Sequence, residues 1–61
     1  MKNSYSEWLA YARGCTDNQL RVVWEDETDR METTFDDHVR VDSIAAMAAC
    51  GIVAAERGLL L

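Results

Sequence analysis

The sequence predicts an all-α fold, a small three-helix domain in which a short N-terminal helix precedes a helical hairpin. Its composition favours helix, because the 61 residues include no proline and only three glycines, and alanine is abundant. Helix-capping patterns and a long stretch of helically spaced apolar residues locate the three elements. A chain of this length forms one domain, residues 1–61, with a thin core that buries only about 60% of the surface exposed on unfolding.

The first helix is predicted to begin after Ser4 and to end at Gly14. Ser4 and Glu7 have the spacing of a capping box, in which each side chain bonds the backbone amide of the other residue. Gly14 suits the left-handed conformation that closes many helices. A helix of about nine residues does not persist alone in water, so its apolar side must dock on the rest of the chain. That side carries Tyr5, Trp8, Leu9 and Ala12.

A second capping box, Thr16 with Gln19, predicts a helix that runs on from Asp17. Cys15 and Leu20 occupy the flanking positions at which a hydrophobic staple forms. Apolar residues then recur at helical spacing along one side, at Leu20, Val23, Trp24 and Met31.

Glu27 interrupts the apolar side of this second helix. We expect it at the margin of the core, where its carboxylate stays in water, because buried carboxylates are rare. The alternative is a contact with an arginine of the first helix, such as Arg13.

Residues 19–36 also fit an α+β alternative, αββα, with a central β-hairpin. Several of them are β-branched, and two short stretches alternate with period two. The turn near Glu27 to Arg30 lacks glycine, asparagine and proline, which hairpin turns prefer. The sequence therefore favours the helix and leaves the hairpin as the alternative.

The third helix is capped either by Thr34, with Asp36 and Asp37 in its first turn, or by Asp42 or Ser43. Gly58 is placed to end it. Apolar residues recur at helical spacing, and small or apolar residues also fill the flanks, so the helix has almost no polar side. The recurring set is Val41, Ile44, Ala48, Ile52, Ala55 and Leu59.

Two short helices cannot cover such an apolar helix on all sides, so we expect the chain to self-associate through it as a homodimer. The alternative is a core helix that leaves one modest apolar patch in solvent. The apolar run from 44 to 55 has twelve residues, whereas a membrane span needs about 20, and no membrane partner is expected. The predicted self-association residues are Ile44, Ala48, Gly51, Ile52 and Ala55.

The net charge of −5 and the pI near 4.5 argue against direct binding to nucleic acid or to an anionic membrane, which require a basic surface. The expected partner is a basic or neutral protein. The start Met1-Lys2-Asn3-Ser4 leads into polar residues without an apolar signal region, which favours a cytoplasmic location. Cys15 and Cys50 are expected to be buried thiols, or a disulfide if their Cα atoms lie within about 7 Å.

No arrangement typical of catalysis occurs in the sequence, and we do not expect an enzyme. There is one histidine, with no glycine-rich phosphate loop and no serine in an elbow motif. His38 follows two aspartates, but three adjacent side chains rarely converge on one metal ion. We therefore predict neither a metal site nor a cofactor.

Seven of the thirteen residues from Glu25 to Asp37 are carboxylates. On a continuous helix, four of them fall within roughly 60° of one another, at Glu25, Asp29, Glu32 and Asp36. Like charges four residues apart cost a few tenths of a kcal/mol per pair, so the pattern is either tolerated as a solubilising surface or used for binding. The predicted partner-binding residues are Glu25, Asp26, Asp29, Glu32, Asp36 and Asp37.

The runs Ala12-Arg13-Gly14-Cys15-Thr16-Asp17-Asn18-Gln19-Leu20-Arg21 and Ala55-Glu56-Arg57-Gly58-Leu59 resemble small helical accessory proteins of bacterial prophages and mobile elements. Short acidic proteins of this kind are similar to anti-CRISPR and related anti-defence inhibitors. The resemblance implies a non-catalytic, cytoplasmic inhibitor that docks on a basic, nucleic-acid-handling partner such as a CRISPR effector, as a DNA mimic. The alternative is a structural or assembly module of a phage or mobile element that self-associates through the alanine-rich helix.

Overall fold

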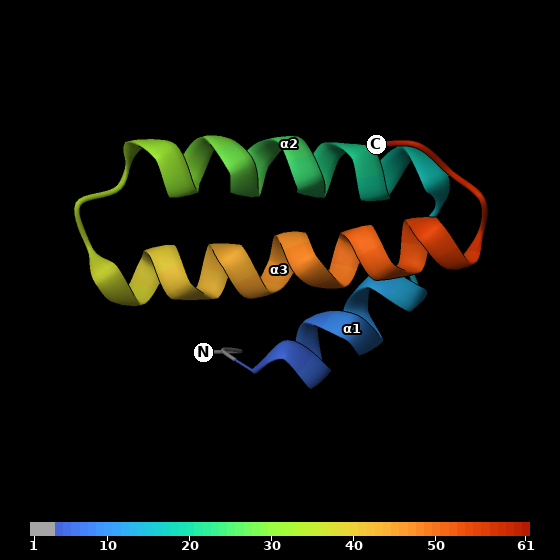
Figure 1. Ribbon diagram of the computed structural model, residues 1–61, viewed down its shortest axis with the longest axis horizontal. Coiled ribbons are helices and arrows are strands. Elements are labelled where there is room, and N and C mark those ends of the chain that lie inside the picture. The colour runs from blue at the N-terminus through green and yellow to red at the C-terminus, as the bar shows by residue number, and fades with distance from the viewer. Residues whose placement is uncertain (1–3) are drawn as a thin grey trace.

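The computed structural model describes residues 4–61, which form three α-helices joined by short connections (Figure 1). The helices are α1, Tyr5–Arg13; α2, Asp17–Thr33; and α3, Asp37–Glu56. α2 and α3 lie side by side and antiparallel, and α1 packs against α3. The predicted all-α domain with a helical hairpin is confirmed. The αββα alternative is wrong, since residues 17–33 are one continuous helix.

The predicted caps explain why α1 and α2 begin where they do. The Glu7 amide donates to the Ser4 hydroxyl at 3.2 Å, but the Glu7 carboxylate accepts from that hydroxyl, at 3.0 Å, and not from the Ser4 amide. The capping box predicted there is therefore only half formed. At α2 the capping box is complete, because the Gln19 amide donates to Oγ1 of Thr16 at 3.1 Å and the Thr16 amide donates to Oε1 of Gln19 at 2.8 Å. These bonds pair amides that helix geometry leaves without partners.

The N-cap of α3 is Asp36, and the predictions of Thr34, Asp42 or Ser43 as its start are wrong. Oδ1 of Asp36 accepts from the His38 amide at 2.9 Å. Thr34 belongs to the end of α2 instead, because it is the C-cap of that helix and its amide donates to the Arg30 carbonyl at 2.9 Å. Its Oγ1 accepts from the Asp36 amide at 3.1 Å and so bonds the cap residue itself, not an amide inside α3. Aspartate is a preferred residue at the N-cap.

The end of α3 is closed by Gly58, as predicted. Gly58 has φ +70°, the Leu59 amide donates to the Ala54 carbonyl at 2.8 Å, and the Gly58 amide donates to the Ala55 carbonyl at 3.1 Å. This bonding pattern is a Schellman motif, which places a glycine in the left-handed region.

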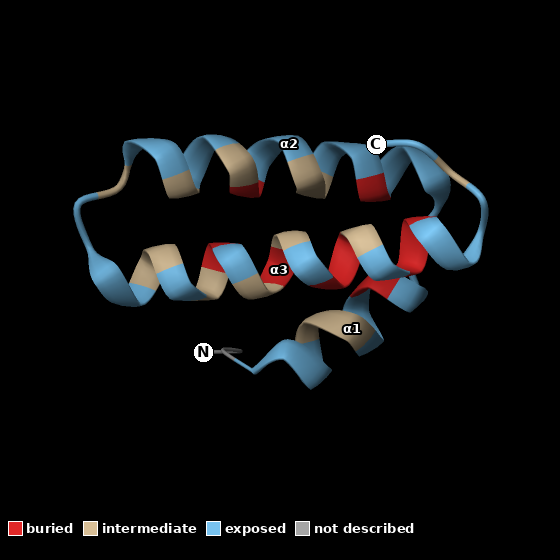
Figure 2. Ribbon diagram, in the orientation of Figure 1, coloured by how far each residue is buried: buried red, intermediate tan, exposed pale blue. Residues whose placement is uncertain are grey.

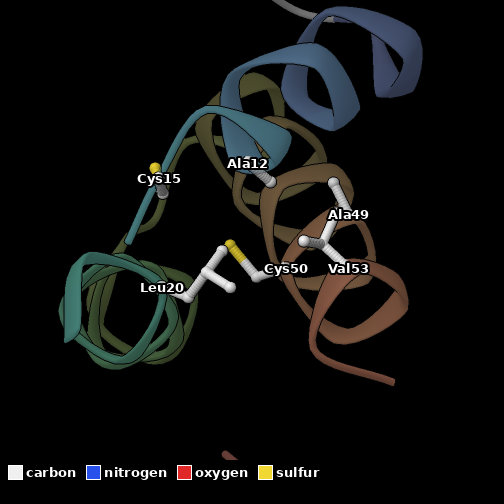
Figure 3. Packing of buried hydrophobic residues seen from close by; sticks show 6 residues of the cluster. All are labelled: Ala12, Cys15, Leu20, Ala49, Cys50 and Val53. Carbon is white, nitrogen blue, oxygen red and sulfur yellow. The ribbon is translucent and has the colours of Figure 1, made fainter. Parts of the chain in front are cut away.

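The core is small and built mostly from small side chains. Leu20 of α2 and Cys50 of α3 meet between their helices, with Val53 and two alanines beside them (Figure 3). Cys15 belongs to the same buried cluster as Leu20. Both cysteines are free and buried, as predicted for two thiols.

The residues that α3 buries are no larger than valine, whereas both of its isoleucines are exposed. Figure 2 shows how buried and exposed positions alternate along α3. Its buried side contains no side chain larger than Val53, which lets α1 and α2 pack closely on the same helix, because interaxial distance depends on the side chains at the contact. The apolar series that identified the helix in the sequence thus lies largely on its solvent side. The buried residues of α3 are Ser43, Ala46, Ala49, Cys50, Val53 and Ala54.

Candidate functional site

Four exposed carboxylates of α2 form what we call the acidic face: Glu25, Asp29 and Glu32 on the outward side of the helix, and Asp26 at the edge near α1. Figure 2 shows this side of α2 exposed along most of the helix. None of the four makes an ion pair with another residue between 4 and 61. Their field is therefore not neutralised by neighbouring side chains, although all four are solvated.

Asp36 and Asp37 are exposed but do not lie on α2. The predicted stripe of four carboxylates on one helix is wrong at Asp36, because α2 ends at Thr33 and Asp36 caps α3. Asp37 pairs with Arg40 across one turn of α3, at 3.1 Å. These two aspartates extend the negative charge around the connection between α2 and α3 without forming a continuous row.

The other ion pairs between helices lie away from the acidic face. Arg13 contacts Glu56 at 3.4 Å, and Arg57 contacts Asp17 at 3.0 Å. Both pairs join the C-terminal end of α3 to the segment between α1 and α2. The two arginines at that end are thus paired with carboxylates, while the acidic face keeps an excess of negative charge.

Phe35 is a candidate contact residue that sequence reasoning missed. Its side chain is 100% exposed in the connection between α2 and α3, next to Asp36. An aromatic ring in solvent beside carboxylates has the composition of a protein-binding anchor. The signal in the sequence was a large aromatic residue in the connection between two helices, between the cap residues Thr34 and Asp36. At that position the side chain has no place in the core.

Glu27 is buried, and the prediction that it lies wet at the core margin is wrong. It is only 5% exposed, on the side of α2 that faces the other helices. Nη1 of Arg30 lies 3.5 Å from Oε2, and Oε1 has no hydrogen-bond partner among the described residues. The alternative contact with Arg13 is also absent between these residues, since Arg13 pairs with Glu56. Glu27 is buried because its position along α2 places it on the side of the helix that faces the core, although its side chain is charged.

The solvent side of α3 carries the second candidate surface, which we call the apolar face: Val41, Ile44, Ala48, Ile52 and Ala55, all exposed. Ile44 and Ile52 keep nearly half of their surface in solvent. A cavity of about 340 Å³ adjoins Ile44 and is lined by Trp24, Ile44, Met47, Ala48 and Gly51.

Gly51 sits between the apolar face and α2. A Cβ atom built on it would lie 3.9 Å from Cζ3 of Trp24, an ordinary contact distance. The predicted self-association residues are thus exposed except for Gly51, which is partly covered.

By length and composition alone, α3 meets the requirement for a membrane-spanning helix, with a mean hydropathy of 1.4 over 18 residues. The central helix of a soluble protein passes the same test, and in this fold two helices pack on α3. Between residues 4 and 61 no three histidine, cysteine or acidic side chains gather as a metal site would require.

Comparison with known proteins gives no further assignment, because no family profile, curated protein or solved structure matches the chain.

Proposed function

We propose that the protein is a non-catalytic inhibitor that docks through its acidic face on a basic surface of a nucleic-acid-handling protein, such as a CRISPR effector. The observation that carries the proposal is the set of four exposed carboxylates on one helix, none of which forms an ion pair with a residue between 4 and 61. Carboxylates held at fixed spacing attract a groove lined by lysine and arginine, and they accelerate association in a strongly salt-dependent way.

The position of these carboxylates supports a binding role over simple solubility. Glu25 and Asp29 lie four residues apart, where like charges repel, and Glu32 lies in the last turn of α2, where the helix dipole disfavours negative charge. The chain keeps these residues at a cost in helix stability. Phe35, at the end of the same surface, adds an apolar contact.

The test neutralises the acidic face with the triple variant Glu25→Gln, Asp29→Asn, Glu32→Gln. Binding to a CRISPR effector, measured by calorimetry at two salt concentrations, is expected to weaken at least about tenfold and to lose most of its salt dependence. The variant should fold at least as stably as the parent protein, because the substitutions remove repulsion along α2.

The matched control is Glu7→Gln, Asp17→Asn, Glu56→Gln, which changes the net charge by the same amount at exposed positions outside the acidic face. If both triple variants weaken binding equally, net charge rather than the acidic face governs the interaction. Unchanged binding in the acidic-face variant would exclude the proposal for that partner.

A second candidate function is an assembly module that forms homodimers through the apolar face. The observation in its favour is that α3 exposes two isoleucines and Val41 along one side, bordered by small residues that permit close approach of another helix. Its test is the concentration dependence of self-association, with Ala48→Glu as the disrupting variant.

A further inference from the structure

The strongest unexplained feature of the molecule is a cavity between α1 and α2. Both helices pack mainly on α3, and their own side chains leave a space of about 310 Å³. This volume is at the lower end of the range for small-ligand sites. The lining residues are Trp8 and Tyr11 of α1 with Val23, Asp26, Glu27 and Arg30 of α2.

Glu27 is the group in this cavity that the fold does not explain. Its side chain is 7% exposed and Oε1 has no partner among residues 4–61. Arg30 reaches only Oε2, at 3.5 Å, and half of the arginine side chain is in solvent. A buried carboxylate oxygen without a partner is costly, and an apolar side chain at this position would continue the apolar side of α2.

The cavity wall opposite Glu27 is aromatic and fixed in orientation. The rings of Trp8 and Tyr11 lie edge to face, with centroids 5.7 Å apart and planes at 84°. Nε1 of Trp8 donates to Oδ1 of Asp42 at 2.9 Å, which holds the indole in place. Aromatic rings and a carboxylate are the two groups that together bind an organic cation.

From this geometry we propose that the cavity receives one basic side chain of a partner protein, with the carboxylate of Glu27 as its acceptor. Arginine fits best, because its planar guanidinium both stacks on aromatic rings and donates to carboxylates. Asp26 at the rim adds a second negative charge, so the site keeps a net negative charge despite Arg30. This inference rests on the proposed function and identifies which partner group enters the protein.

The probe is a pentapeptide with a central arginine and alanine at the other positions, blocked at both ends. The matched ligand replaces the arginine with citrulline, which has nearly the same shape and no charge. Titration is followed by the NMR signals of the Trp8 indole N–H and the Glu27 amide. The arginine peptide is expected to produce saturable shifts, and the citrulline peptide at least about tenfold weaker binding.

The decisive variant is Glu27→Gln, with Glu56→Gln as the control that makes the same change at an exposed position near the C-terminal end of α3, outside the cavity lining. Glu27→Gln should abolish saturable binding of the arginine peptide, and Glu56→Gln should leave it within about twofold. Glu27→Gln should also unfold at the same or a higher temperature than the parent, since it removes a buried charge. Equal binding by both variants, or no saturable shift in the parent, would overturn the inference.

Stability separates this role from a structural one. If Glu27 served only as the ion-pair partner of Arg30, Glu27→Gln would lower the melting temperature, and the arginine peptide would not distinguish the two variants. Failure here also differs from failure of the proposed function. If the acidic-face variant no longer binds the CRISPR effector while Glu27→Gln still binds it, the cavity inference alone is refuted.

Discussion

Burial in the small core changes the pKa of one of its residues, Cys50. Its side chain is buried between α2 and α3. Burial raises the pKa of the Cys50 thiol above its ordinary value of 9.0, and Cys15 and then Glu27 add smaller contributions in the same direction. The fold therefore holds the thiol proton more tightly than the unfolded chain does. The resulting stabilisation is fully present below the ordinary pKa and is lost as pH rises through the raised value.

We predict that the free energy of unfolding falls between about pH 7.5 and pH 9.5, and that Cys50→Ala falls less over this range. Both proteins should carry Tyr11→Phe, because the pKa of Tyr11 is also raised, chiefly by Cys15. Urea unfolding at the two pH values measures the difference. Parallel losses in the two proteins would show that Cys50 does not cause the pH dependence.

The three helices begin and end through local contacts that lie within a few residues of one another. The sharpest case is Gly58, whose positive φ allows the Schellman motif at the end of α3. Gly14 also follows a helix, but its φ of −87° is accessible to any residue. A residue with a Cβ atom is therefore strained at position 58 but not at position 14.

We predict that Gly58→Ala lowers the free energy of unfolding by about 1–2 kcal/mol, because alanine is strained in the left-handed region. Gly14→Ala is the control, since its Cβ would meet only the Tyr11 carbonyl oxygen at 3.5 Å. It should be neutral or stabilising by up to about 1 kcal/mol. Thermal unfolding of both variants checks the difference, and equal destabilisation would contradict it.

At the scale of the whole molecule, two surfaces of opposite character lie on different helices. The acidic face belongs to α2 and the apolar face to α3. The core beneath them contains few large side chains, with Leu20 and Val53 the largest hydrophobic ones that are fully buried. A domain with so thin a core gains stability when a partner covers more of its apolar surface.

If the apolar face self-associates, the melting temperature is expected to rise by several degrees over about a hundredfold range of protein concentration. Ala48→Glu should remove this rise and sediment as a monomer, because it places a charge in the centre of the apolar face. Ala10→Glu, at an exposed position of α1, is the matched control. A melting temperature independent of concentration in the parent would exclude dimerisation in that range.

The sequence alone determined where α1 and α2 begin and where α1 and α3 end, but neither the end of α2 nor the start of α3. Ser4, Thr16 and Gly58 act on backbone groups only a few residues away, so their effect does not depend on the rest of the fold. At the start of α3 the candidate caps were close neighbours, and in the fold Thr34 became the C-cap of α2 while Asp36 became the N-cap of α3. The fold class and the acidic character of the outer surface followed from the same local patterns.

Only the tertiary structure decided which sides of the helices are covered. α3 is apolar around nearly its whole circumference, so periodicity could not choose between the side of Ile44 and the side of Cys50. Close packing of two helices on α3 selected the small residues. The same packing buried Glu27, because the position of a residue on a helix, rather than its polarity, determines which neighbours it meets.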